Sequence, residues 1–218
     1  MENFKTLDKG FNYNSSRSNH KGNIMSLIPD FELGLWNAWI LVLSFLLLFT
    51  VWEILNRLWG QKGSSRPNKP PFHEKEKKLY GISQLIFWAS VIYSVFLPLK
   101  LGTVWFYAGL LAYLLGMIFT IVAGTSLDNT PMNGPATEGL YRISRNPIYL
   151  GTFLIFIGIG IACASWLFLL LTAVFIVLYD ILIAPEERWC LEKYGEAYQE
   201  YMNKTPKWIG IPKSEKND

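Results

Sequence analysis

The apolar residues of this chain are gathered into long runs that polar segments separate. Three of these runs, residues 33–55, 79–99 and 102–125, contain a single charged residue, Glu53. A helix needs about 20 mostly apolar residues to cross the hydrocarbon core of a bilayer. Each of the three runs therefore predicts one membrane-spanning helix.

A fourth run, residues 148–184, is too long for one ordinary span. It holds 37 residues, and Asp180 is its only charge. Small residues at 162–165, followed by Trp166, favour a turn that leaves segments of about 15 and 18 residues, short for the hydrocarbon thickness. The sequence therefore predicts an all-α, polytopic membrane helix bundle of about five transmembrane helices, with a short helical hairpin near the C-terminus.

The distribution of basic residues predicts the orientation of this bundle. With five spans, the connections 56–78 and 126–146 and the tail from Pro185 lie on one side, and they carry 15 of the 20 Lys and Arg residues. Connections rich in Lys and Arg remain in the cytoplasm. We therefore expect these segments, including a cytoplasmic C-terminal helix, to face the cytoplasm.

The N-terminal part divides into a polar tail and one added span. Residues 1–32 are expected to form the tail and residues 33–58 an additional transmembrane helix. The basic stretch 60–71, rich in Pro and Gly, indicates a linker or a weak contact with anionic lipid. The net charge of +3 fits a basic surface beside such lipid, and no nucleic-acid-binding motif is present.

Cysteine and histidine are too few for a disulfide framework or a metal centre. Cys163 and Cys190 fall at opposite ends of the last predicted span, so they are not expected to pair. His20 and His73 lie in predicted loops. We therefore predict no metal site.

Arg145, Asn146 and Pro147 open the fourth apolar run. Asn is a favoured N-cap and Pro a favoured first helical residue, so helix capping explains them structurally. Arg142 and Arg145 would then be anchors at the membrane interface. A functional interpretation is also open, because Arg145 and the free N–H groups of a helix start attract a carboxylate.

Pro185, Glu186 and Glu187 predict a second helix start with acids in its first turn. The hairpin returns the chain to the same membrane face, so the two helix starts become neighbours. The Glu pair would attract an ammonium group or a sugar hydroxyl, and Arg145 a carboxylate. A ligand that carries both groups, such as an amino-acid-bearing cofactor, fits this charge pattern.

Further candidates surround these two clusters. The rings of Tyr141 and Tyr149 could stack on adenine or face a sulfonium cation, or they could belong to an interfacial aromatic belt. Asp180 is either a site acid or an acid that reaches water from the end of the span. After Glu187, a helical pattern forms an aromatic face that could lie on the membrane or close over a pocket; its members are Trp189, Leu191, Tyr194, Ala197, Tyr198 and Tyr201.

At these residues the chain resembles the superfamily of isoprenylcysteine carboxyl methyltransferases and phospholipid methyltransferases, which are integral membrane enzymes. The resemblance covers residues 79–208 and rests on Gly139-Leu-Tyr141, Arg145-Asn-Pro-Ile-Tyr149, Glu186-Glu187 and Tyr194-Gly-Glu-Ala-Tyr198-Gln-Glu-Tyr201. Asn146 stands where the family pattern has His. Asn at this place is similar to the lipid amine methyltransferases and to many prokaryotic members.

The resemblance implies a membrane methyltransferase domain over residues 79–218 that binds S-adenosylmethionine in a cytoplasmic pocket between segments 137–150 and 185–208. The residues that it implies for cofactor binding are Gly139, Tyr141, Arg145, Asn146, Pro147, Tyr149, Leu150, Glu186 and Glu187. Of these, Arg145, Asn146 and Glu187 are also expected to be catalytic. The implied acceptor is a lipid or lipophilic small molecule that enters from the bilayer, either a phospholipid amine or an isoprenylcysteine-like carboxylate.

Two other classes of protein share some of these features. Sterol-type membrane reductases, which use NADPH, have a segment similar to Lys193-Tyr194-Gly195 of this chain. They have roughly twice as many spans, so this likeness is only an analogy between folds. A non-enzymatic helical membrane protein would need neither a cofactor nor the Glu pair. Binding of a cofactor separates the three classes.

Overall fold

The computed structural model describes residues 25–27, 31, 33–58, 72–131 and 133–210. Within these residues the regular structure consists of six α-helices and one short 3-10 helix. The all-α prediction is therefore confirmed. Most of the predicted polar tail and the whole of the basic stretch 60–71 lie outside the described residues.

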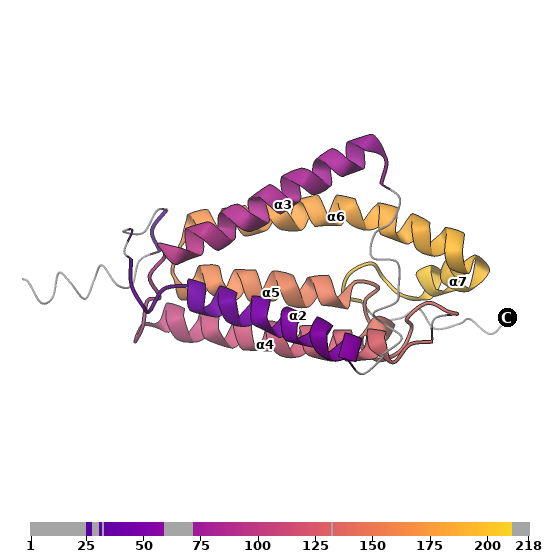
Figure 1. The fold of residues 1–218 in the computed structure, drawn as a ribbon, viewed down its shortest axis with the longest axis horizontal. Helices are drawn as coiled ribbons and strands as arrows, with labels where there is room; N and C mark the ends of the chain where they lie inside the picture. Colours follow the sequence, from indigo (N-terminus) through magenta and orange to yellow (C-terminus); the bar gives the residue numbers. More distant parts are fainter. Residues whose placement is uncertain (1–24, 28–30, 32, 59–71, 132, 211–218) are drawn as a thin grey trace, which may run out of the picture.

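Five long helices form an elongated bundle (Figure 1). They are α2 (Trp39–Leu58), α3 (Glu74–Val95), α4 (Val104–Asp128), α5 (Pro147–Ala162) and α6 (Trp166–Tyr194). The helices α2, α4 and α6 are long and apolar enough to cross a membrane, and α5 is a shorter apolar helix. The α3 helix begins with the charged run Glu74–Lys78 before its apolar residues start.

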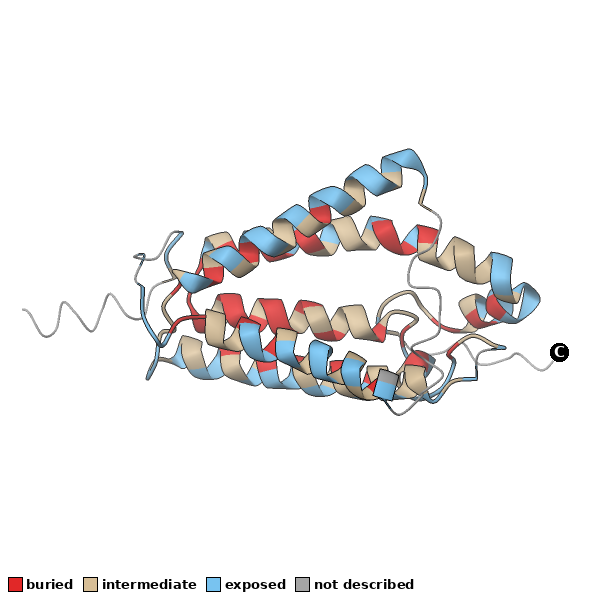
Figure 2. Cartoon of the chain, in the orientation of Figure 1, coloured by how far each residue is buried: buried red, intermediate tan, exposed pale blue. Residues whose placement is uncertain are grey.

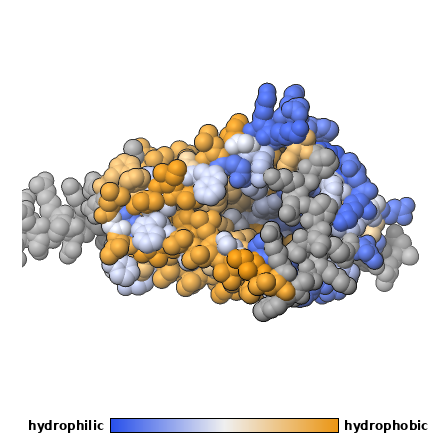
Figure 3. Space-filling model, viewed as in Figure 1, coloured by the Kyte–Doolittle hydropathy of each residue, from blue (hydrophilic) through white to orange (hydrophobic). Residues whose placement is uncertain are grey.

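The surface of the bundle is that of a membrane protein. Large apolar side chains are exposed along the outer faces of the helices, among them Leu85, Leu111, Leu170 and Val177. Figure 3 shows the apolar residues along the bundle and the hydrophilic residues gathered at the end that carries α7 (Glu196–Lys204). Lipid rather than water is the solvent that such a surface requires.

The α4 and α5 helices approach each other unusually closely through glycines. A Cβ atom on Gly116 would lie 2.7 Å from the Ile155 backbone nitrogen, and one on Gly158 would lie 2.5 Å from that of Tyr113. Small residues allow this approach, which strengthens packing between helices in lipid. Gly158 therefore serves to pack α5 against α4.

An aromatic and aliphatic core fills the space beside α5 and α6. Phe156 stacks on Phe168 at a centroid distance of 6.2 Å and on Phe175 at 5.8 Å. Ile155 and Ile159 are fully buried in the same region, and Figure 2 shows buried residues along α5. This core holds α5 and α6 in a fixed relative position.

The predicted turn between the last two apolar segments is confirmed. The α5 helix ends at Ala162 and α6 begins at Trp166, with Ala164 at a φ of 49° between them. The Ser165 hydroxyl caps α6 by accepting a hydrogen bond from the Phe168 N–H at 3.3 Å. The backbone of Ser26 also pairs with this turn, donating to the Ala164 carbonyl at 3.0 Å.

The predicted helix start at Pro185 is wrong, because α6 continues through Pro185 to Tyr194. Proline is tolerated inside membrane helices since neighbouring helices and local adjustment accommodate the missing N–H donor. With 29 residues, α6 is about 43 Å long at 1.5 Å per residue, so its last turns project beyond a hydrocarbon core of about 30 Å. Both Glu residues therefore lie on the projecting end of a continuous helix.

The chain turns sharply after α6. Gly195 has a φ of +56°, a left-handed conformation that glycine adopts without steric cost, and α7 follows directly. The predicted aromatic C-terminal helix is thus divided between the end of α6 and α7. Tyr198 and Tyr201 of α7 are buried, and Thr205 is the C-cap that follows the last helical residue, Lys204.

Polar contacts join the helix ends on the side of α7. The Asn56 side chain of α2 donates to Asp128 of α4 at 2.9 Å. Arg188 of α6 donates to both carboxylate oxygens of Glu76 in α3, at 3.1 and 3.0 Å. The ends of α2, α4 and α6 and the start of α3 therefore meet at one end of the bundle, as helices that alternate in direction require.

Candidate functional site

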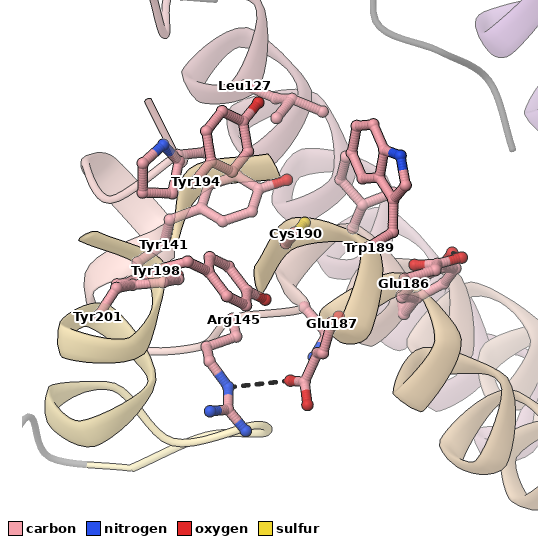
Figure 4. A pocket seen from close by; sticks show the side chains of 15 residues that line it. Leu127, Tyr141, Arg145, Glu186, Glu187, Trp189, Cys190, Tyr194, Tyr198 and Tyr201 are labelled. Carbon is pink, nitrogen blue, oxygen red and sulfur yellow. Dashed lines mark hydrogen bonds and ion pairs between the residues drawn. The ribbon is translucent and has the colours of Figure 1, made fainter. Parts of the chain in front are cut away.

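A cavity of about 280 Å³ lies at this polar end, between the segment before α5, the end of α6 and α7. Figure 4 shows its side chains converging from these elements. The lining residues are Leu127, Pro135, Ala136, Tyr141, Arg145, Asn146, Ile148, Tyr149, Glu186, Glu187, Trp189, Cys190, Tyr194, Tyr198 and Tyr201. Its volume is near the lower end of the range of about 300–1,000 Å³ for small-molecule pockets.

The segment before α5 is shaped by a glycine. Gly139 begins the 3-10 helix Gly139–Arg142 and has a φ of +61°. A Cβ atom there would also collide with the Ser126 hydroxyl of α4. Gly139 does not line the cavity, so its visible role is to let the chain turn and place Tyr141 in the wall.

Arg145 and Glu187 lie side by side in the wall of the cavity, with their charged groups in contact (Figure 4). The Arg145 Nε atom lies 3.1 Å from Glu187 Oε1, and the two side chains are 11% and 15% exposed. The contact is an ion pair without hydrogen-bond geometry, so both atoms lack a hydrogen-bond partner among the described residues. Buried polar atoms with unused hydrogen-bonding capacity are costly unless a ligand completes them.

Asn146 occupies the N-cap position of α5, and Pro147 is the first helical residue, as the sequence indicates. The Asn146 amide, however, does not cap the helix. It donates to the backbone carbonyl of Lys207 at 3.1 Å, and the Arg145 N–H donates to the carbonyl of Pro206 at 3.0 Å. These bonds fasten the C-terminal segment to the loop that carries Arg145.

The two adjacent glutamates have different surroundings. The Tyr149 hydroxyl donates to Glu186 Oε1 at 2.7 Å, and the Tyr149 ring lies 5.2 Å from that of Tyr179. Glu187 instead points toward Arg145, because consecutive residues of a helix face different directions (Figure 4). One carboxylate is thus held by a phenol and the other by a guanidinium.

Tyrosines form the opposite wall. The Tyr201 hydroxyl donates to the Tyr141 carbonyl at 2.7 Å, which ties α7 to the 3-10 helix. Burial raises the pKa of the Tyr198 and Tyr201 phenols well above the usual value of 10.0. Both phenols therefore stay neutral at physiological pH and present uncharged aromatic faces to the cavity.

The cavity contains most, but not all, of the residues that the sequence singles out. It includes Tyr141, Arg145, Asn146, Tyr149, Glu186 and Glu187, together with the aromatic residues Trp189, Tyr194, Tyr198 and Tyr201. Gly139, Pro147 and Leu150 do not line it.

Asp180 also lies elsewhere. Its carboxylate contacts Lys207 Nζ at 2.6 Å and accepts from Trp208 Nε1 at 2.9 Å. Asp180 therefore anchors the C-terminal segment instead of lining the cavity.

Sequence reasoning missed five lining residues, Leu127, Pro135, Ala136, Ile148 and Cys190. Pro135 and Ala136 come just before segment 137–150, which carries the motif. Their closeness to that segment in the sequence could have identified them as lining residues. Leu127 comes from the end of α4, and only the tertiary structure shows that it reaches the cavity.

The described residues offer no cluster of three or more His, Cys, Asp or Glu side chains that could hold a metal ion. Cys163 and Cys190 are both free thiols. What the site does offer is a guanidinium, two carboxylates and several neutral aromatic rings within one cavity.

Comparison with known protein families finds a match that includes most of the cavity wall. Residues 97–197 match the family of phospholipid methyltransferases. The matched range includes α4, α5, α6 and every residue of the cavity wall except Tyr198 and Tyr201. No curated protein matches the chain significantly.

Proposed function

We propose that this integral membrane protein transfers a methyl group from S-adenosylmethionine to a lipophilic acceptor, because residues 97–197 match the phospholipid methyltransferase family. The cavity beside Arg145 and Glu187 is the proposed binding site of the methyl donor. The assignment of residues 79–218 as the membrane methyltransferase domain belongs to the same proposal.

The observation that carries the proposal is the buried pair of Arg145 and Glu187. An amino-acid moiety has one carboxylate and one ammonium group, and this pair offers one partner for each. The Nε and Oε1 atoms have unused hydrogen-bonding capacity, so a ligand could gain charge-assisted hydrogen bonds there. The distribution of charge in the cavity thus fits the amino-acid end of the donor.

The aromatic wall fits the remainder of the donor. Neutral tyrosine faces attract a sulfonium cation and stack on adenine. Tyr141, Tyr198 and Tyr201 supply such faces on the side of the cavity away from the glutamates (Figure 4). The bound donor supplies an electrophilic methyl group, while the protein aligns the acceptor and excludes water.

The acceptor decides whether the protein must also remove a proton. A carboxylate acceptor needs no base, whereas a primary or secondary amine must lose a proton as the new bond to carbon forms. Glu186 and Glu187 are the acids in the cavity that could take this proton. Asn146 could orient a ligand by hydrogen bonding, but an amide cannot shuttle a proton near neutral pH as histidine does.

The proposed site faces the cytoplasm. The cavity lies at the end of the bundle to which the segments with most Lys and Arg residues belong, and such segments remain cytoplasmic. An acceptor lipid would reach the cavity from the adjoining leaflet.

Thermal unfolding in detergent tests the proposal. S-adenosylhomocysteine, the product of methyl transfer, should raise the melting temperature of the purified protein, whereas NADPH should leave it unchanged. A ligand at a hundredfold excess over its dissociation constant contributes about 2.7 kcal/mol to the stability of the folded state. Stabilisation by NADPH alone would identify a reductase, and stabilisation by neither ligand, with isothermal titration also showing no binding, would contradict the proposal.

A further inference from the structure

The C-terminal segment, residues 205–210, lies beside the loop that carries Arg145 and is joined to it through the backbone. The Arg145 N–H donates to the Pro206 carbonyl at 3.0 Å, and the Gly210 N–H donates to the Ile143 carbonyl at 3.2 Å. Each segment supplies one donor and one acceptor. The two bonds therefore fix how the segment and the loop lie against each other.

Side chains of the loop reinforce this joint at the Lys207 carbonyl. That carbonyl accepts hydrogen bonds from the Asn146 amide at 3.1 Å and from the Ser144 hydroxyl at 3.3 Å. Ser144 is fully buried, and its hydroxyl also accepts from the Asn146 N–H at 3.0 Å. The Arg145 guanidinium in turn donates to the Met202 carbonyl at 3.3 Å. The position of Arg145 therefore depends on the C-terminal part of the chain.

The C-terminal segment is itself held by one residue of α6, Asp180. Lys207 Nζ lies 2.6 Å from Asp180 Oδ1 and also donates to the Asp180 backbone carbonyl at 2.7 Å. Trp208 Nε1 donates to Asp180 Oδ1 at 2.9 Å, and the Trp208 ring lies 5.5 Å from that of Phe153 in α5. Two consecutive side chains of the segment thus converge on Asp180.

Asp180 and Glu187 lie on the same face of α6. They are seven positions apart, which is nearly two full turns at about 3.6 residues per turn. Each carboxylate contacts a different cation: Asp180 contacts Lys207, and Glu187 contacts Arg145 at 3.1 Å. The hydrogen bonds between the loop and the C-terminal segment connect these two cations. One face of α6 therefore holds both ends of this connection, and Glu187 is the end that lies in the cavity.

We propose that Asp180 and Lys207 are positioning residues of the methyl-donor site, because their ion pair holds the C-terminal segment where it fixes Arg145. This inference rests on the proposed function and adds two residues that do not line the cavity. Lys207 also lies beyond the family-matched residues 97–197. Ordering a long side chain during binding costs affinity, so an Arg145 that is already fixed binds a carboxylate more tightly. The pair thus raises donor affinity and takes no part in methyl transfer itself.

The test compares the full-length wild type in detergent with Asp180→Asn, Lys207→Met and the double variant. Each single change keeps the approximate length of the side chain and removes one charge of the pair. We expect the Kd of S-adenosylhomocysteine and the KM of S-adenosylmethionine to rise about fivefold, near the upper limit for a partly exposed ion pair. The double variant should bind as well as the single variants, because all three remove the same interaction. The value of kcat at saturating donor should not change, because the pair affects binding and not the chemical step.

Two controls separate positioning from a general loss of stability. Lys207→Arg keeps the positive charge and should retain an affinity close to that of the wild type. Glu200→Gln breaks an exposed ion pair of α7, in which Lys204 Nζ lies 2.7 Å from Glu200 Oε1, and should leave Kd and KM unchanged. A purely structural role would lower the melting temperature and the number of binding sites found by isothermal titration, while the remaining sites would keep the wild-type Kd.

The outcomes separate this inference from the proposed function. Wild-type Kd in both Asp180→Asn and Lys207→Met would overturn the positioning role and leave the methyltransferase standing. Additive losses in the double variant, equal weakening by Glu200→Gln, or a lower kcat with unchanged KM would also overturn it. Failure of the wild type to bind S-adenosylhomocysteine would overturn both proposals. If Asp180→Asn does not fold, Lys207→Met decides the question by the same titration, because Lys207 lies outside the helices.

Discussion

At the scale of single residues, Arg145 has two separable roles. Its backbone N–H donates to the Pro206 carbonyl, and its Nη1 atom donates to the Met202 carbonyl at 3.3 Å. Its Nε atom instead faces Glu187. The side chain is therefore part of the cavity wall and also a link between segments. Any substitution must be checked for both effects.

We predict that Arg145→Ala abolishes detectable binding of S-adenosylhomocysteine, because the proposed carboxylate partner is lost and Glu187 remains buried without its cation. Isothermal titration measures the binding, and circular dichroism confirms that the helices remain. Arg142→Ala is the matched control, because Arg142 is exposed and does not line the cavity. Wild-type affinity in Arg145→Ala would remove Arg145 from the donor site.

Glu187→Gln should reduce kcat at least tenfold if Glu187 orients the donor or accepts a proton, since a neutral amide performs neither task as well. The variant keeps the size of the side chain, so the cavity should retain its shape. Initial rates of methyl transfer from radiolabelled donor provide the measurement. Activity equal to that of the wild type would show that Glu187 takes no part in the reaction.

Gly139 is a structural residue of the site, and its replacement tests that role. We expect Gly139→Ala to destabilise the protein by roughly 1–3 kcal/mol, because an L-residue is strained at its positive φ and its Cβ meets Ser126. The double variant Ser126→Gly, Gly139→Ala should recover the part due to the collision and not the part due to φ. Thermal unfolding measures both variants, and an unchanged melting temperature in the single variant would contradict this account.

At the scale of elements, α3 is tied to α6 by the bidentate pair of Glu76 and Arg188. The hydrogen bond from Arg188 lowers the pKa of Glu76 below its usual value of 4.5. A carboxylate whose pKa is lowered by folding stabilises the fold at pH values above 4.5, and this contribution disappears as pH falls through the lowered pKa.

The melting temperature of Glu76→Gln should therefore lie below that of the wild type at pH 7, and the difference should shrink as pH falls below 4.5. Thermal unfolding across this range in one detergent provides the comparison. Glu74→Gln serves as a control at the same helix start, because Glu74 pairs with the exposed Lys77 of its own helix. A constant difference at all pH values would show that charge is not the cause.

At the scale of the whole molecule, the antiparallel bundle places the cavity beside Arg145 and the end of α6 at one end of the bundle and the turn near Leu101 at the other. We predict that, in a variant with Cys163 and Cys190 replaced by alanine, Glu192→Cys reacts with a membrane-impermeant maleimide only from the cytoplasmic side. Leu101→Cys should react only from the opposite side, because Leu101 is exposed at the other end of the bundle. The reverse labelling pattern would contradict a cytoplasmic site.

The sequence by itself determined which segments are helical and apolar, and where the chain turns between Ala162 and Trp166. Those features follow from local periodicity, run length and small residues, which act over short distances along the chain. The order and spacing of the sequence motifs also singled out Arg145 and the Glu pair as candidates, and the structure places these residues in one cavity. The positions of Asn146 and Pro147 at the start of α5 were likewise predictable from capping preferences.

Only the tertiary structure decided how these pieces meet. The sequence could not reveal that α6 continues through Pro185, because packing against neighbouring helices outweighs the local preference of proline for a helix start. Nor could it show that Asp180 binds the C-terminal segment, or that Leu127 borders the cavity. These contacts join residues far apart in the chain, so their formation depends on the geometry of the whole bundle and not on any local pattern.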